Sequence, residues 1–158
     1  MRLSTKGRYG LRALLDVAVY SEEEPVSIRS IAQRQNISEA YLEQLMPKLK
    51  KAGLIDSQRG ASGGYRLTRP AEEISVGEVL RALEGELDAV NCPGLKEAAS
   101  EEEGCSEAHT CVTKYVWQRI NDSITKTVDE ISLSILVEQS RQIHEESSAN
   151  VSGKRACC

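Results

Sequence analysis

Three cysteines close together in the second half of the chain are the residues whose type and spacing suggest chemistry. Cys92, Cys105 and Cys111 follow the pattern C-x12-C-x5-C. Thiolates are soft ligands that suit iron–sulfur clusters and zinc. The segment has no C-x2-C pair of the zinc-ribbon kind, and three thiolates leave a four-ligand site one ligand short. The spacing therefore leaves two interpretations open, a metal or cluster site and three ordinary thiols.

A fourth ligand would have to come from outside the three cysteines. His109 lies in the pattern C-x3-H-x-C, and Glu107 is close to it. A residue of another subunit is a further source, whereas the acidic run 101–103 is typical of solvated charge. Cys157 and Cys158 are adjacent, and two neighbouring cysteines cannot easily bind one metal, so we predict that they are exposed thiols.

The composition limits where such thiols would be found. The chain has 158 residues, of which 40% are hydrophobic and 28% charged, and it contains no Phe. These values are ordinary for a globular protein with an aliphatic core. No apolar run approaches the ~20 residues of a membrane helix, and the first residues lack the pattern of a secretory signal. We therefore expect a cytoplasmic protein without membrane contact, in which the five cysteines stay reduced.

Charge divides the chain into two unequal halves. Residues 1–70 carry 12 Lys and Arg against 7 Asp and Glu, a net charge of +5. Residues 71–158 carry 8 against 17, a net charge of −9. A basic half joined to an acidic half indicates that the basic half is the place to look for nucleic-acid binding. The alternative is chance clustering of solvated charge.

Two helices are predicted before residue 36. Residues 8–20 repeat apolar side chains at near-helical spacing, and a polar turn containing Pro25 ends the pattern. Ser27 is a suitable N-cap for a short helix over 28–34.

A third helix follows after a tight turn. Asn36 tolerates the left-handed conformation that such a turn requires. Ser38 then caps a helix over 38–52 that ends at Gly53, with lysines in its last turns. Pro47 lies inside this segment, so either the helix is kinked there or the predicted boundary is wrong.

A β-hairpin is predicted next. Strand candidates at 54–58 and 65–68 flank the sequence RGASGG. We expect Gly63 and Gly64 to supply the positive φ angles of the hairpin tip.

The rest of the chain is helical apart from the cysteine segment. Ser75 caps a predicted helix over 76–83. Residues 112–131 have an apolar stripe that steps by three or four residues and suits a partner helix. A last helix is predicted over 133–143, and the remaining residues are predicted to be disordered.

Two short helices, a tight turn and a hairpin form the winged helix-turn-helix pattern, in which the second helix enters the major groove of DNA. In the segment 38–52, Leu42, Leu45 and Leu49 form the core stripe. The side chains predicted to contact DNA from this helix are Ser38, Tyr41, Glu43, Gln44, Lys48 and Lys51. Amides read adenine edges, lysines bind phosphates or guanine, and a glutamate filters sequences by repulsion.

The hairpin offers three further cations. Arg59 stands at its base, and Arg66 and Arg69 lie on the returning side. An arginine on a wing suits a narrow minor groove. The competing interpretation is that each lysine and arginine, taken singly, is an ordinary solvated side chain.

Several separate segments together resemble the IscR family, bacterial winged-helix regulators of iron–sulfur cluster assembly genes. The segments are RLSTKGRYGLRALLDVA, ISEAYLEQLMPKLKKAGLI, RGASGGYRL, ISVGEVLRALEG and the cysteines ending in CVTKYVW. The resemblance covers about residues 1–137. It implies a mainly α fold with a small β-hairpin wing, a winged helix-turn-helix domain joined to a long dimerisation helix.

The resemblance also implies a site and partners. It places DNA contacts on Ser38, Tyr41, Glu43, Gln44 and Arg59. It implies a homodimer on double-stranded promoter DNA and a 2Fe–2S cluster held by Cys92, Cys105 and Cys111. The expected organisation is a winged domain over 1–85, a cysteine loop over 86–111, dimerisation and return helices over 112–144, and a flexible tail over 145–158.

Two departures from the family pattern matter. The first gap between cysteines is longer here than in well-known members. The usual fourth ligand is a histidine three residues after the last cysteine, where this chain has Lys114, and an ammonium is a poor ligand. The related nitric-oxide sensor NsrR uses an acidic residue in the first helix of the partner subunit, where this chain has Arg8. The fourth ligand is therefore open, with His109 as a candidate.

Three rival functions follow from these departures. One is a cluster-free repressor resembling CymR, which senses cysteine metabolism through a partner enzyme such as a cysteine-biosynthesis enzyme or a desulfurase. Another is a nitric-oxide sensor. The most distant is a thiol oxidoreductase. RGASGG lacks the Lys-Ser/Thr of a phosphate loop, so a nucleotide-dependent enzyme is not expected.

Overall fold

The computed structural model describes residues 3–90, 92–95, 105 and 109–153. Ten elements follow one another within these residues. They are α1 (Thr5–Tyr20), α2 (Ile28–Gln35), α3 (Glu39–Lys51), β1 (Ile55–Gln58), β2 (Gly64–Leu67), η1 (Ala71–Glu73), α4 (Val76–Glu84), η2 (Pro93–Leu95), α5 (Val112–Glu130) and α6 (Leu133–Gly153). The predicted mainly helical fold with a small wing is confirmed.

Serine side chains begin the helices of the N-terminal half. The hydroxyls of Ser27, Ser38 and Ser75 each accept a hydrogen bond from the backbone N–H three residues later, as the sequence predicts. Ser4 caps α1 in a similar way, through the N–H of Lys6. At Ser75 the side chain of Glu78 also accepts from the N–H of the cap residue, which completes a capping box.

The helix-turn-helix is formed by α2 and α3. Asn36 ends α2 in the left-handed conformation, with φ 52° and ψ 51°, which confirms the predicted turn. α3 continues through Pro47 to Lys51, so the predicted boundary holds. Pro47 is on the exposed side of α3.

The wing is a two-stranded antiparallel sheet in which Ile55 pairs with Leu67 and Gln58 pairs with Gly64. The prediction for its tip is wrong in one respect. Gly60, with φ 122°, is the glycine of the hairpin in the left-handed region, whereas Gly63 and Gly64 are required for close approach. A Cβ on Gly63 would lie 2.5 Å from the carbonyl oxygen of Gln58, and a Cβ on Gly64 would lie 2.5 Å from the backbone of Val26.

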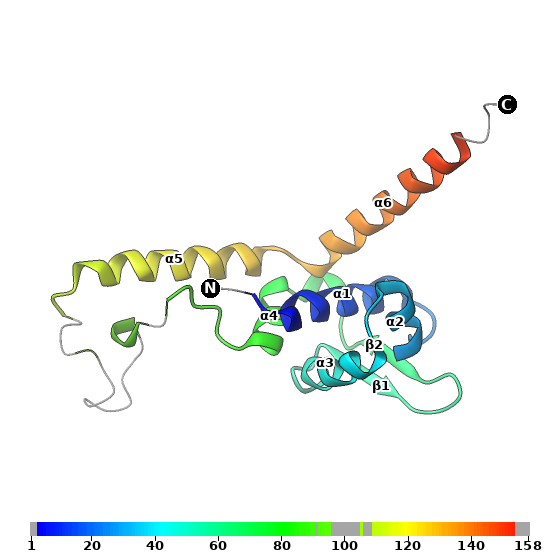
Figure 1. The fold of residues 1–158 in the computed structure, drawn as a ribbon, viewed down its shortest axis with the longest axis horizontal. Coiled ribbons are helices and arrows are strands. Elements are labelled where there is room, and N and C mark those ends of the chain that lie inside the picture. Colours follow the sequence, from blue (N-terminus) through cyan, green and yellow to red (C-terminus); the bar gives the residue numbers. More distant parts are fainter. Residues whose placement is uncertain (1–2, 91, 96–104, 106–108, 154–158) are drawn as a thin grey trace.

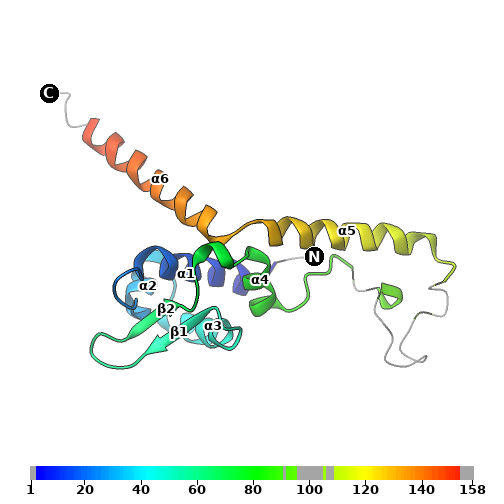
Figure 2. The same ribbon diagram turned by 180° about the vertical axis from the view of Figure 1, so that it is seen from behind.

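One aliphatic core joins α1, α2, α3, the wing, α4 and Leu133 at the start of α6. Its fully buried members include Leu14 of α1, Ile31 of α2, Leu42 of α3, Ile55 of β1 and Val79 of α4. Figures 1 and 2 show these elements gathered into one body, with α5 and α6 leaving it in different directions. We call this body the winged domain.

The last two helices extend away from the winged domain, and α5 has the predicted bounds whereas α6 does not. α5 contains no buried residue. α6 runs to Gly153, past the predicted end at residue 143, so residues 144–153 are helical rather than irregular. None of the helices described is long and apolar enough to cross a membrane.

Candidate nucleic-acid interface

The two faces of α3 separate as the sequence predicts. Leu42, Leu45 and Leu49 are at most 1% exposed. Met46, which the predicted stripe left out, is buried with them. The opposite face carries the exposed side chains of Glu39, Glu43, Gln44, Lys48 and Lys51, and Ser38 is exposed at the start of the helix. α3 therefore has the buried side and the polar side that a recognition helix needs.

Tyr41 lies at the edge between these two faces. Its ring meets Tyr9 of α1 edge to face, with centroids 5.9 Å apart and planes at 86°. The guanidinium of Arg12 stands 5.6 Å from the centroid of the Tyr9 ring. Half-buried Tyr41 is therefore positioned by α1.

The lysines of α3 have different surroundings. The Lys48 ammonium donates to the backbone carbonyl of Leu83 in α4, at 3.4 Å. Lys50 donates to Ser57 of β1 and lies 3.4 Å from a carboxylate oxygen of Asp56. The Ser57 N–H and Lys50 hold the pKa of Asp56 below its ordinary value. Lys51 is exposed, so its cation is the best placed of the three for a phosphate.

The arginines of the wing also differ from one another. Arg59 is exposed and is the first residue of the loop that joins β1 to β2, at the tip of the hairpin rather than at the predicted base. Arg66 donates to the carbonyl of Glu23 at 3.4 Å, and Arg69 forms an ion pair of 2.6 Å with Glu78. Burial alone would raise the pKa of Glu78, but the hydrogen bonds from Arg69 and Ser75 outweigh it and lower that pKa. The geometry therefore keeps Arg59, and not Arg69, as the candidate minor-groove residue.

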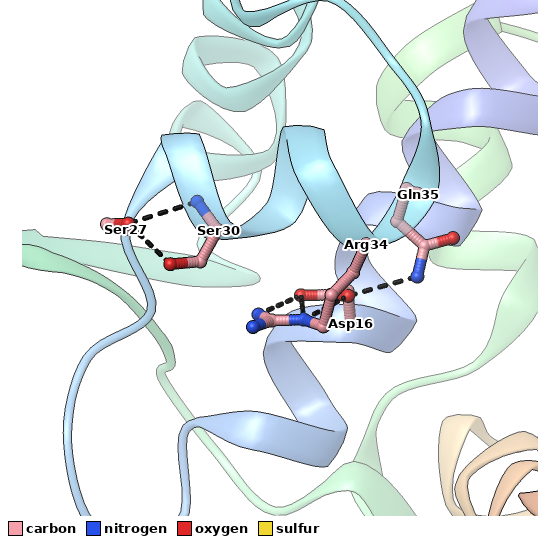
Figure 3. Close-up of polar contacts among 5 residues, drawn as sticks. All are labelled: Asp16, Ser27, Ser30, Arg34 and Gln35. Carbon is pink, nitrogen blue, oxygen red and sulfur yellow. Dashed lines mark hydrogen bonds and ion pairs between the residues drawn. The ribbon is translucent and has the colours of Figure 1, made fainter.

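A buried carboxylate joins α1 to α2. Asp16 is 1% exposed and accepts two hydrogen bonds from Arg34 Nε and Nη2, at 3.0 and 2.7 Å, and one from Gln35 Nε2 at 3.0 Å. Figure 3 shows Arg34 and Gln35 converging on Asp16. The guanidinium of Arg34 also lies 4.1 Å from the centroid of the Tyr20 ring. The hydrogen bond to Asp16 raises the pKa of Arg34, so α2 is locked against α1 by a charged pair.

The three predicted cysteine ligands lie between α4 and α5. Cys111 is the N-cap residue of α5, and its Sγ lies 3.2 Å from the hydroxyl of Thr113. Cys92 is half-buried in a cleft that also has Lys114 on its wall, and Cys105 is exposed. Cys92, Cys105 and Cys111 are not joined by disulfide bonds.

Within residues 3–90, 92–95, 105 and 109–153, no three His, Cys, Asp or Glu side chains come close enough together to hold a metal ion. His109 is exposed. Glu107, Cys157 and Cys158 lie outside the described residues.

Both ends of the cysteine loop are fixed to the rest of the chain. At its start, the N–H of Ala89 donates to the Asn121 side chain of α5 at 2.9 Å. At its end, Cys111 leads directly into α5. Arg81 of α4 forms an ion pair with Asp129 of α5, so the helices on either side of the loop are also tied to each other.

Sequence reasoning missed two groups of residues. The Asp16–Arg34–Gln35 network contained one signal, a charged residue among apolar positions of α1. The second group is Glu84, whose carboxylate accepts hydrogen bonds from the start of α1. No local pattern marks this residue, because its partners lie almost the length of the winged domain earlier in the sequence.

A helix-turn-helix followed by a two-stranded wing defines a winged-helix DNA-binding protein. Residues 3–139 match the Rrf2 family, described as iron-dependent transcriptional regulators. The chain belongs to the Rrf2 family.

Curated relatives of the chain are named as the transcriptional regulator IscR. The chain is 45% identical over 137 residues to the transcriptional regulator IscR of Photorhabdus laumondii, covering 87% of this chain and 79% of that one. It is 44% identical over 137 residues to IscR of Pectobacterium carotovorum, with the same coverage. The predicted resemblance to IscR regulators is confirmed, and the thiol-oxidoreductase alternative is wrong because these relatives are transcriptional regulators.

Solved structures include both kinds of regulator that the sequence suggested. The structure of T. potens IscR is 42% identical, covers 89% of this chain and 88% of its own, and has a TM-score of 0.67. CymR, the global cysteine regulator of B. subtilis, is 37% identical, with 88% and 98% coverage and a TM-score of 0.69. The chain is an IscR-type transcriptional regulator of the Rrf2 family, with a DNA-binding function.

Proposed function

We propose that this chain acts as a homodimer that binds promoter DNA through α3 and the wing and reports iron–sulfur status through a 2Fe–2S cluster. The observation that carries the DNA-binding part is the arrangement of α3. Its apolar face is buried while Glu43, Gln44 and Lys51 are exposed, and the exposed Arg59 follows on the wing. This combination offers base-reading and phosphate-binding groups on neighbouring elements.

The face of α5 supports the dimer. Val112, Tyr115, Val116 and Ile120 are 85%, 65%, 46% and 38% exposed. Such an apolar stripe on one helix is typical of a surface covered by another helix. A symmetric dimer would present two α3 helices to half-sites about 34–36 Å apart.

The chemistry of the cysteine loop supports the cluster. Three cysteines outside disulfide bonds, all between α4 and α5, supply the soft ligand set that iron–sulfur clusters use. Cys111 stands at the N-terminus of α5, where the helix dipole favours a negatively charged ligand set. We propose that Cys92, Cys105 and Cys111 hold the cluster, with His109 as a candidate fourth ligand. The bound cluster would supply a group whose presence depends on iron supply and redox state.

Anaerobic purification followed by a visible absorption spectrum tests the cluster. We expect iron and sulfide in the protein, and charge-transfer bands that disappear in Cys105→Ala. Ser106→Ala, next to the cysteine, is the matched control and keeps the bands. A colourless protein without iron after anaerobic handling contradicts the cluster.

Binding of a promoter duplex tests the DNA surface. Arg59→Ala should weaken specific binding by about 1–3 kcal/mol if the side chain reads a groove. Lys51→Ala should weaken binding to all duplexes and reduce the salt dependence by about one counterion. If neither substitution changes binding, α3 and the wing are not the DNA surface.

A cluster-free cysteine regulator is the second candidate. It is favoured by the likeness to CymR and by Lys114, which stands where the family has a histidine ligand. This version would bind DNA without iron and would associate with an enzyme of cysteine biosynthesis or a desulfurase. An iron-free protein that binds a promoter selectively supports it over the cluster.

A further inference from the structure

The C-terminal end of α4 contacts both α1 and α3. The Glu84 carboxylate accepts hydrogen bonds from the Ser4 N–H at 3.0 Å, the Ser4 hydroxyl at 2.6 Å and the Gly7 N–H at 2.8 Å. Ser4 and Gly7 begin α1, so Glu84 caps α1 from another part of the chain. One residue earlier, the Leu83 carbonyl accepts from Lys48 of α3.

Glycines bring α1 and α4 into close contact at this place. A Cβ on Gly7 would lie 2.7 Å from a Glu84 carboxylate oxygen, and a Cβ on Gly10 would lie 2.3 Å from Leu83 Cδ1. Both separations are shorter than two non-bonded atoms tolerate, so α1 and α4 can approach this closely only because these positions lack side chains. The start of α1 is therefore packed directly against the end of α4.

α1 also contacts α3 directly. Tyr9, five residues after Ser4, packs edge to face on Tyr41. Thr5 and Tyr9 share a groove of about 290 Å³ with Ser38 and Tyr41. The start of α1 thus borders the residues with which α3 is proposed to contact DNA.

The cysteine loop begins at the same end of α4. Gly85 has φ 90°, a conformation that favours glycine, and the chain turns there from α4 into the loop. The loop is held again at Ala89 by Asn121. The segment that leads to Cys92 therefore leaves α4 directly after Glu84 and is fixed to α5 four residues after Gly85.

From these contacts we infer that Glu84 is a positioning residue, which sets the placement of Tyr41 and Lys48 on the DNA surface and connects that surface to the cysteine loop. The inference rests on the proposed function, because it assigns Glu84 a part in the same DNA binding. Glu84 itself does not touch DNA. It acts through α1 and through the end of α4.

The first test is Glu84→Gln in the full-length chain, using the duplex that the wild type selects from a random-sequence pool. The amide keeps the size of the side chain but has one acceptor oxygen instead of two. We expect specific binding to weaken by about 2- to 30-fold, the range for residues that act on a site without touching its ligand. The random duplex should be affected less, because phosphate contacts tolerate displacement better than base contacts.

The matched control is Glu73→Gln, which removes the same charge from the exposed η1 turn and should leave binding unchanged. Far-ultraviolet circular dichroism establishes that each variant is folded. If Glu84→Gln does not fold, Ser4→Ala removes one of the donors and leaves the carboxylate in place. In the double variant the two effects should not add, because Ser4 and Glu84 are in direct contact.

The second test compares the iron-loaded and iron-stripped proteins. In the wild type we expect a ratio of DNA affinities between the two forms of about 5- to 150-fold. Glu84→Gln should bring this ratio toward one. A ratio equal to that of the wild type, or unchanged specific binding in the first test, overturns the inference.

Failure of the proposed function gives results different from failure of the Glu84 inference. If Lys51→Ala and Arg59→Ala also leave binding unchanged, the DNA surface is wrong. If the wild-type ratio is already one, iron sensing is wrong, and the link from Glu84 to the loop is overturned with it. If those variants weaken binding and Glu84→Gln does not, only the role of Glu84 is lost.

Discussion

The winged domain and α5 differ in how far their apolar side chains are buried. In the winged domain, Leu14, Leu42 and Val79 are completely buried within one chain. In α5, Val116 and Ile120 are 46% and 38% exposed, although their spacing is as regular. The winged domain is therefore complete in a single chain, whereas α5 presents a surface that a second chain would cover. Four predictions test this contrast between a packed and an exposed surface, and each outcome either strengthens the contrast or removes it.

The largest expected effect comes from the core of α3. Leu45→Ala should reduce the free energy of unfolding by about 2–5 kcal/mol, because it opens a cavity among packed side chains. Ile120→Ala should cost under about 1 kcal/mol at low protein concentration. Urea denaturation at several protein concentrations measures both. Equal costs in dilute protein would mean that α5 is also packed within one chain.

The second prediction concerns the lock between α1 and α2. Asp16→Asn removes the charge that holds Arg34, and we expect a loss of about 1.5–3 kcal/mol. The expected loss is moderate because the Arg34 side chain is 34% exposed and its cation can turn toward water. Glu22→Gln, which alters the exposed pair with Arg141, is the control and should cost under about 1 kcal/mol. If the two losses are equal, burial does not distinguish the pairs.

Much of the winged domain could be predicted because its signals are local. Ser27, Ser38 and Asn36 act on backbone groups within a few residues, and each was found in the predicted role. The position of the wing was predicted correctly, but the physical reason why it needs Gly63 and Gly64 was predicted wrongly. Gly64 is needed because Val26 passes against it, and this contact joins positions far apart in the sequence.

The candidate site was less predictable for the same reason. The sequence places Lys48 and Arg69 on polar surfaces, but the carbonyl of Leu83 and the carboxylate of Glu78 engage them. These partners are set by the packing of α4. In α6 the polar residues after Ile143 suggested an irregular tail, although the helix continues. Glu145, Glu146 and Ala149 are good helix formers there, although the other residues of the segment are weaker ones.

The third prediction concerns the loss of stability of the winged domain in acid. Burial alone would raise the pKa of Glu84, but hydrogen bonds from Ser4 and Gly7 outweigh it, and the pKa lies below the ordinary value of 4.5. Glu78 behaves in the same way. The stabilisation from both carboxylates is present above about pH 4.5 and is lost as the pH falls through their lowered pKa values.

Urea midpoints of the winged-domain transition between pH 7 and pH 3 check this sign. The midpoint should fall with acidification below about pH 4.5, and it should fall less steeply in Glu84→Gln. A slope identical to that of the wild type would mean that Glu84 has the same pKa in the folded and unfolded chains.

The smallest effect is expected on α5. Lys126 and Glu130 form an exposed pair, 3.9 Å apart and one turn from each other. Lys126→Ala should change the free energy of unfolding by no more than about 0.5 kcal/mol. Thermal unfolding in low and high salt measures it. A loss above 1 kcal/mol would show that the polar side of α5 is also a packed surface.

The junction between α5 and α6 gives α6 the properties of a lever arm. The carbonyl of Ile131 accepts from the Val76 N–H at 2.8 Å, and the N–H of Leu133 donates to Ile74 at 2.8 Å, so the pivot is pinned at the start of α4. The first half of α6 lies on the winged domain, where Leu133 is buried and Arg141 pairs with Glu22. Residues 142–153 extend about 18 Å beyond these contacts, so a tilt of roughly 5° moves the tip by about 2 Å. Small tilts of α4 are therefore magnified at the far end of the molecule, where a fluorescent label would register them.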